Sequence, residues 1–553
     1  MKLFINYFIQ FSQFNYQSFM NIAQRRLYML SFVVTFLLTA PILVFLAKGY
    51  SFDIIGGVFV HNGAVIIKSN PKKVDLYLDG KKVSNKMLNI INNYYVINGV
   101  RFGNHTIEAK KDGYTTWKKK IDVHSGVSTE FWNILLFPKN NNTVKTYLPE
   151  NIKSFYLSPR KNKELLLYKT NNKEKIISLF NSQDNQEVIL YTTNKYDALV
   201  PDINENIEWS SNHKKILIPA KKNNKKDYII TDANNNPSKI TINLVKLLSN
   251  INSKVFNIPL ENTENIPKSP EELPMHTKST MANKELFPEI YHARWMFNSD
   301  HQILVLTQNH LLFFVDINDI TKTILLAKNV NGFDLAGDHV YYTDLTNNTI
   351  VDIKPNKPSY HQIITNINLD INSASFLRIF AYDELRITLI TPNNTLYLFN
   401  NDKANKKTTF EMVEKGVINI QFSDDGKKFL YWTNFDLWNY MLRDWTNQPK
   451  RLKGEKIFIT SFASGIKNIQ WMETFENIIF TNNLFLKAVE LDNRDHVNLS
   501  NIIKVNSLPQ ENTYIYDKAT STLYFLDKIK ENSVVKLHSI KLIEHNGLFN
   551  FGK

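Results

Sequence analysis

Cysteine is absent from this chain of 553 residues. Without a thiol the protein can form no disulfide, no thiolate metal site and no cysteine nucleophile, and its redox compartment stays open. The sequence also lacks HExxH, GxSxG, GxxxxGKS/T and GxGxxG. These are the local signatures of zinc proteases, serine hydrolases, phosphate-binding loops and dinucleotide folds. We therefore expect no cofactor and no metal, and we name no catalytic or ligand-binding residue.

The charge and the length set the next bounds. The net charge of +14 and the pI near 9.3 suit nucleic acid, a membrane surface or an acidic polymer equally well. The chain is rich in Asn, Lys and Ile, a bias that AT-rich genomes impose. Part of the positive charge can therefore reflect genome composition rather than function. The 43% hydrophobic content is ample for packed cores, and the length exceeds the usual ceiling for one core. Two or more domains are expected.

A long apolar run stands near the N-terminus, from Leu27 to Ala47. As a helix it would measure roughly 31 Å, which matches the hydrocarbon core of a bilayer. Arg25 and Arg26 precede it, and residues 1–26 contain no acidic side chain. By the positive-inside rule, 1–26 is predicted to be a cytoplasmic leader, 27–47 an uncleaved transmembrane anchor, and the rest extracytoplasmic.

Two other interpretations of this run stay open. A buried helix of a soluble protein is seldom apolar on every face over such a length. A cleavable signal peptide usually has a shorter apolar region, and no convincing small-x-small cleavage site follows. Translation can start at Met1 or at Met20, since MNIAQRR before an apolar run is a typical signal-anchor opening.

Residues 57–138 have the alternation of a small β-domain. Its most conspicuous stretch, Lys110 to Gly126, surrounds a Gly-Tyr-x-x-Trp motif with lysines. Trp117, Ile121 and Val123 share one parity, and Lys118, Lys120 and Asp122 share the other, which predicts a strand with a core face and a solvated face. Lys119 falls on the apolar parity, which suggests a bulge or a sheet edge guarded by lysine. Asp79-Gly80 predicts a tight turn.

Several motifs of this β-domain resemble the PEGA domain in order and spacing. They are Ser69-Asn-Pro71, Val74-Asp-Leu-Tyr-Leu-Asp-Gly80, Gly103-Asn-His-Thr-Ile107, Lys111-Asp-Gly-Tyr114, Trp117 and Val123-His-Ser-Gly126. The sequence departs from the family where Lys72, Lys73 and Val74 replace Glu, Gly and Ala, and where Phe102-Gly103 replaces Pro-Gly. The resemblance implies a β-sandwich-like extracytoplasmic module with no catalytic centre. The aromatic and basic residues are then a core and a solvated face, so no nucleic-acid partner is expected. Attraction to anionic lipids or an acidic wall polymer stays open.

One phrase recurs from about Asn151 onward, an apolar-x-aromatic strand followed by a polar turn and another apolar strand. Clear copies begin at Phe155, Ile207, Ala293, Ile420 and Ile469, and weaker copies near Phe333, Ile379 and Ile515. Eight units over roughly 400 residues give about 50 residues each, the size of a propeller blade. The Ser-Asp-Asp-Gly-Lys-Lys run at Ser423 resembles the turn of Tol-system and WD-like propellers. We therefore predict a β-propeller of seven or eight blades over 150–545.

The segment 250–288 interrupts these repeats with five prolines and little periodicity. It is predicted to be an insertion between two blades, with disorder favoured over a functional lid.

Three local patterns have the residue types of a metal site. Two of them match a calcium-binding loop at its first three ligand positions, namely Asp202 to Asn206 and Asp232 to Asn236. Ile207 and Pro237, however, stand where such a loop requires glycine. His301 and His310 could face each other across a hairpin. Hydrogen-bonded turns and packed histidines are the favoured interpretations.

Together these observations predict a mainly β, single-pass membrane protein that resembles uncharacterised bacterial envelope proteins. We expect it to scaffold envelope proteins or to bind glycans through the propeller, without catalysis. The alternative is a propeller hydrolase or lyase acting on envelope polysaccharide. Such enzymes gather carboxylates from separate blades and leave no local motif.

Overall fold

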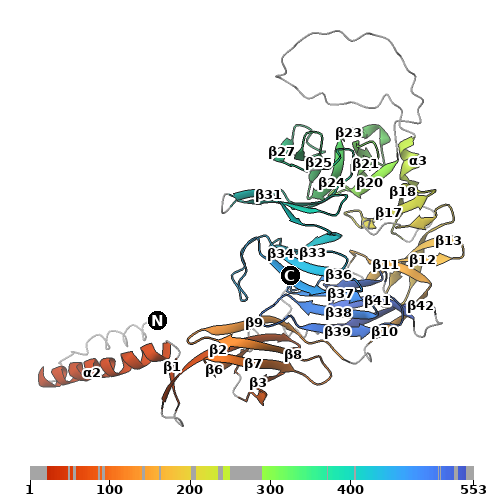
Figure 1. The fold of residues 1–553 in the computed structure, drawn as a ribbon. Helices are drawn as coiled ribbons and strands as arrows, with labels where there is room; N and C mark the ends of the chain where they lie inside the picture. Colours follow the sequence, from red (N-terminus) through yellow and green to blue (C-terminus); the bar gives the residue numbers. More distant parts are fainter. Residues whose placement is uncertain are drawn as a thin grey trace, which may run out of the picture. The chain divides into compact units, whose positions relative to one another are not determined.

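The computed structural model of the chain divides into two compact units (Figure 1). The first takes Met1–Lys111 and Thr116–Ile134, and the second takes Asp112–Thr115 and Leu135–Lys553. The structure describes residues 22–47, 50–53, 58–84, 87–89, 94–139, 144–160, 163–200, 207–234, 241–249, 289–369, 371–403, 407–508, 510, 512–528 and 534–543. The predicted leader up to residue 21, the insertion 250–288 and the Asp202–Asn206 pattern lie outside these residues.

The N-terminal apolar run forms helix α2 (Ile22–Ala47), with Pro41 inside it. The most apolar 18-residue window within Ile22–Phe45 has a mean hydropathy of 2.2, and this window is not buried at all within the structure. The helix is therefore long and apolar enough to cross a membrane, although a signal sequence would have the same properties.

The rest of the first unit consists of two antiparallel sheets. One has the order β1-β2-β6-β5 with β9 also paired to β2, and the other has the order β4-β3-β7-β8. The strands are β1 (Tyr50–Asp53), β2 (Val58–Asn70), β3 (Asp75–Leu78), β4 (Lys81–Lys82), β5 (Met87–Asn89), β6 (Tyr94–Arg101), β7 (Gly103–Lys110), β8 (Trp117–Val123) and β9 (Ser128–Leu135). The rings of Trp117 on β8 and Phe131 on β9 meet edge to face at 5.0 Å between centroids, so the two sheets share a core.

The lysine-rich stretch has the predicted parity. Burial alternates without a break along β8, with Trp117 buried and Lys118 exposed. The predicted bulge is wrong, because the register from Gly103↔Val123 to Ala109↔Trp117 is continuous. The edge position is confirmed, since β8 ends its sheet. Lys119 points inward and is fully buried, and an inward-pointing charge is one of the devices that discourage pairing at an edge.

The turn at Asp79-Gly80 is confirmed in detail. Both residues have positive φ, 49° and 77°, and they join β3 to β4 with Leu78 opposite Lys81. This is the backbone of a two-residue type I′ hairpin.

The second unit contains eight antiparallel sheets among the described residues, and we call them blades 1 to 8. Blade 1 has β11 (Ile152–Leu157), β12 (Glu164–Asn171), β13 (Glu174–Asn181) and β14 (Glu187–Thr193). Blade 2 has β15 (Ala198–Leu199), β16 (Glu208–Trp209), β17 (Lys215–Lys222), β18 (Lys225–Asp232) and β19 (Ile242–Asn243), followed by helix α3 (Leu244–Ser249). Blade 3 has β20 (Ile290–Trp295), β21 (Gln302–Thr307), β22 (Leu312–Asp316), η3 (Ile320–Lys322) and β23 (Ile324–Ala327). Blade 4 has β24 (Val330–Ala336), β25 (His339–Asp344), β26 (Thr349–Ile353) and β27 (His361–Asn366).

The remaining blades follow the same order. Blade 5 has β28 (Arg378–Asp383), β29 (Arg386–Ile390), β30 (Leu396–Asp402) and β31 (Lys407–Glu414). Blade 6 has β32 (Asn419–Phe422), β33 (Lys428–Trp432), β34 (Asp436–Met441) and β35 (Lys456–Ser461). Blade 7 has β36 (Lys467–Trp471), β37 (Asn477–Asn482), β38 (Phe485–Glu490) and β39 (Leu499–Lys504). Blade 8 has β40 (Tyr514–Asp517), β41 (Thr522–Lys528) and β42 (Val535–Lys541), and β10 (Lys145–Glu150) pairs with β42.

These blades form a closed ring. A separate apolar core lies between each blade and the next along the chain, and one joins blade 8 to blade 1 through Tyr147, Phe180 and Tyr524. β10 closes the ring because the first strand of the unit completes the last blade. The fold is thus a β-propeller, and of the two blade counts left open by the sequence the structure has eight.

The abundant asparagine has a structural use in this ring. Twelve of the twenty non-glycine residues with positive φ among the described residues are asparagines. Asparagine tolerates the left-handed conformation that hairpin turns need, and the whole chain contains only 17 glycines. Asparagine thus supplies turn geometry that glycine supplies elsewhere.

Candidate functional site

The eight copies of the repeated phrase fall on the innermost strands, β11, β16, β20, β24, β28, β32, β36 and β40. In several copies the residue between the apolar and the aromatic position is polar. Its side chain accepts a hydrogen bond from a backbone N–H of the next blade. The bonds are Trp295 N to Glu208 Oε2 (3.1 Å), Ala381 N to Asp334 Oδ2 (2.8 Å), Trp471 N to Gln421 Oε1 (3.3 Å) and Tyr516 N to Gln470 Oε1 (2.9 Å).

The indole groups repeat the same link in two of these junctions. Trp295 Nε1 donates to the carbonyl oxygen of Glu208, and Trp471 Nε1 donates to that of Gln421. In these four junctions the polar position of the phrase therefore ties one inner strand to the next.

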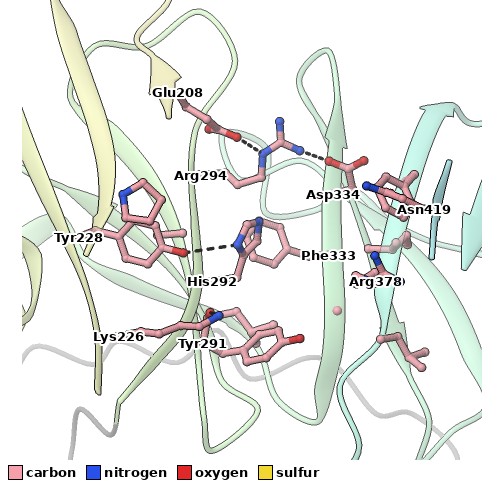
Figure 2. Close-up of a pocket in the computed structure, with 17 residues that line it drawn as sticks. Glu208, Lys226, Tyr228, Tyr291, His292, Arg294, Phe333, Asp334, Arg378 and Asn419 are labelled. Atoms are coloured by element: carbon pink, nitrogen blue, oxygen red, sulfur yellow. Dashed lines mark hydrogen bonds and ion pairs between the residues drawn. The ribbon is translucent and has the colours of Figure 1, made fainter. Parts of the chain in front are cut away.

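A cavity of about 400 Å³ lies against these inner strands, and blades 2 to 6 contribute to its wall. We call it the central cavity. Figure 2 shows Glu208, Arg294 and Asp334 in one row along it, from three successive blades. Arg294 Nε donates to Glu208 Oε1 at 2.6 Å, and Arg294 Nη1 donates to Asp334 Oδ1. One guanidinium thus bridges two carboxylates.

Every carboxylate oxygen in this row accepts a hydrogen bond from a protein donor. The two oxygens of Glu208 take Arg294 and Trp295 N, and those of Asp334 take Arg294, Leu335 N and Ala381 N. Burial disfavours the charge on Arg294, but the two carboxylates outweigh burial and raise its pKa. Because each of the four carboxylate oxygens already accepts a hydrogen bond from the protein, the row is suited to holding blades together.

The other wall of the cavity is aromatic and basic. The Tyr228 hydroxyl and His292 Nδ1 lie 3.5 Å apart, and Lys226 Nζ sits 5.2 Å from the centre of the Tyr291 ring. Burial, with the charges of Arg294 and Lys226, lowers the pKa of His292 to about 3. His292 is therefore neutral at physiological pH, and it lies beside Phe333 (Figure 2).

The residues singled out as metal ligands do not meet. His301 and His310 lie beyond opposite ends of β21, so they do not face each other across a hairpin. His301 Nδ1 bonds Asp300, and His310 stacks on Phe376 at 4.3 Å. At Asp232, the Oδ1 atom accepts from Asn234 N at 2.7 Å, which is the hydrogen-bonded turn favoured from the sequence.

Sequence reasoning found the repeat but missed the role of its central position. A usable signal was present, because three successive copies read Glu208, Arg294 and Asp334, an acid-base-acid alternation on strands that the period places side by side. The sequence does not show that these side chains bond to one another, because Arg294 is 86 residues from Glu208 and 40 residues from Asp334.

The fold defines the class, a β-propeller protein that has, within the described part of the chain, one helix of transmembrane length near the N-terminus. No protein-family model and no curated protein matches the chain. A solved structure that resembles it is the β-propeller domain of Cps50 (Swd1) from Myceliophteria thermophila, with 9% sequence identity and a TM-score of 0.37, covering 72% of this chain and 98% of that one.

Proposed function

We propose that this protein is a non-catalytic, membrane-anchored binding platform of the bacterial cell envelope, with its propeller outside the cytoplasm. The observation that carries this proposal is the row of Glu208, Arg294 and Asp334 in the central cavity, where every carboxylate oxygen accepts a hydrogen bond from the protein. Glu208 and Asp334 form hydrogen bonds with residues of neighbouring blades, and these bonds help to hold the closed propeller together as a scaffold. The anchor is supported by the exposed apolar helix α2, and the PEGA-like motifs support an extracytoplasmic location.

The partners we propose are envelope proteins or cell-surface glycans. A closed propeller exposes only short strand edges at the outside of its blades, and its remaining surface is open to partners.

The topology is tested by protease treatment of intact cells carrying the full chain. External protease should cut the propeller before lysis. A propeller that is untouched in intact cells and is cut only after lysis contradicts the proposed orientation. The mass of the chain recovered from membranes shows whether α2 is an uncleaved anchor or a signal peptide, because cleavage of a signal peptide would remove α2.

The rival function, hydrolysis or cleavage of envelope polysaccharide, is favoured only by the two carboxylates in the central cavity. We expect the purified full chain to release no new reducing or unsaturated ends from envelope polysaccharide. Release that disappears in the Glu208→Gln and Asp334→Asn variants would support the enzyme and contradict the platform.

A further inference from the structure

A second, larger hollow of about 1080 Å³ lies at the junction of blades 3 and 4. Its volume reaches the upper end of the range of roughly 300 to 1,000 Å³ that small-molecule pockets occupy. It therefore has room for a segment of chain. We call it the 3/4 groove, and it shares no lining residue with the central cavity.

The floor of the 3/4 groove is one face of the blade 4 sheet. The lining residues of its strands alternate, with Tyr342 from β25, Thr349, Val351 and Ile353 from β26, and Ile363 from β27. Tyr342 lies directly opposite Val351, and Val351 directly opposite Ile363. Exposure along this row rises from 6% and 4% to 57% at Ile363. An apolar row thus runs from the packed junction into solvent.

The wall of the 3/4 groove is the outermost strand of blade 3. Every residue of β23 lines it, so the wall presents backbone as well as side chains. β23 pairs with β22 on one side and ends its sheet on the other. Its outer edge is paired with no strand among the described residues, and such an edge accepts an added strand.

The exposed charge of the 3/4 groove is basic. Lys322, Lys328 and Lys354 line it, and Lys354 already pairs with Asp338 at 2.9 Å between Nζ and Oδ2. Its two acids are turned inward, since Asp316 Oδ1 accepts from Asn318 N and Asp319 N, and Asp344 Oδ1 accepts from Thr346 N and Asn347 N. The pair between Lys322 and Asp319 is largely exposed and therefore weak.

From these features we infer that the 3/4 groove binds an extended segment of a partner protein in which apolar and acidic side chains alternate. The segment pairs with the outer edge of β23, lays apolar side chains on Ile363 at the exposed end of the row, and turns its acidic side chains toward Lys322 and Lys328. Main-chain bonds supply affinity, and the alternate side chains supply specificity. This inference rests on the proposed platform function and names its partner.

The test uses the full chain in detergent micelles and labelled peptides of about ten residues, measured by fluorescence anisotropy. One peptide alternates Val or Leu with Asp, and a second replaces Asp by Lys. Two further forms of the acidic peptide carry N-methyl groups on alternate amides, one form for each edge of the strand. We expect the acidic peptide to bind, the lysine peptide to bind at least tenfold more weakly, and one N-methylated form alone to lose binding.

The variants locate the site. Ile363→Asp should weaken binding at least tenfold and Lys328→Glu severalfold. Ile189→Asp is the matched control, because Ile189 is 54% exposed on β14, the outer strand of blade 1. It should leave binding unchanged. The melting temperature of each variant shows whether the fold is kept. We expect it to be kept, because both isoleucines are largely exposed.

The inference is overturned if the acidic peptide fails to bind at millimolar concentration, if both charge forms bind alike, or if both N-methylated forms bind like the parent. Dimerisation of the chain that Ile363→Asp abolishes would assign the groove to a second copy and also overturn it. Protease treatment of cells is independent of these outcomes, so the platform can stand while the peptide site fails.

Discussion

At the residue scale, the centre of the propeller depends on Arg294. Its side chain is 31% exposed into the central cavity, and its guanidinium satisfies carboxylates from the blades on either side. A planar group with several fixed donors can serve two carboxylates at once, which a lysine cannot do as well. The row therefore links three successive blades.

Arg294→Met should lower the free energy of unfolding by about 3 to 5 kcal/mol, because it leaves two partly buried carboxylates without their partner. Denaturant unfolding of residues 135–553 measures the change. The matched control is Lys403→Met, whose surface pair with Glu384 is 64% and 46% exposed and should contribute less than about 1 kcal/mol. Equal losses in the two variants would contradict the structural role of the row.

His292 should make the propeller acid-sensitive. Its folded pKa of about 3 lies below the ordinary value near 6.5, so the unfolded chain binds the extra proton below that pH. Stability is then lost as the pH falls from about 6.5 toward 3, at up to about 1.4 kcal/mol per pH unit. His292→Gln should flatten this slope in denaturant titrations at pH 7, 6 and 5. A difference between the two proteins that does not change with pH would refute the assignment.

At the element scale, the inner strands approach one another closely. A Cβ atom on Gly332 of β24 would stand 2.5 Å from the carbonyl oxygen of Leu377, which comes just before β28. The backbone of Leu377 also donates its N–H to Asn331 O at 2.7 Å. Glycine is thus required here by space and not by φ.

Gly332→Ala should destabilise the propeller by about 1 to 3 kcal/mol, since backbone atoms must move to admit the methyl group. Gly337→Asn, in the turn after the same strand, is the control. There φ is +63° and the Cβ position is open, so asparagine should be accepted at little cost. Thermal unfolding of both variants measures the change, and a Gly332→Ala variant as stable as the unaltered chain would show that the contact with Leu377 is unimportant.

The elements themselves were largely predictable. The parity of β8, the turn at Asp79-Gly80 and the eight repeated units all follow from patterns within a few residues. The inward direction of Lys119 also follows from the parity. The choice between a bulge and a sheet edge does not, because that choice depends on the register of β8 with β7.

At the scale of the whole molecule, the ring depends on β10. This strand pairs with β42 across 392 residues of sequence, with Thr146 bonded to His538 and Tyr147 bonded to Ser539. Tyr147 also packs in the core between blades 8 and 1. Closure thus joins the two ends of the unit through both backbone and core.

A chain of residues 151–553, which lacks β10, should unfold several kcal/mol more easily than residues 135–553, because the edge of β42 is bared and Tyr147 is lost. The midpoint in urea measures this, and hydrogen exchange should locate the loss in blades 8 and 1. Equal midpoints would mean that the ring does not need its closing strand.

The sequence by itself determined the apolar helix, the strand parities, the turns and the blade-sized repeat, because each depends on interactions between residues close in the chain. Only the tertiary structure decided the count of eight blades, the closure by β10, the Glu208, Arg294 and Asp334 row, and the 3/4 groove. These join residues tens to hundreds of positions apart, and no local pattern records which distant side chain will meet which.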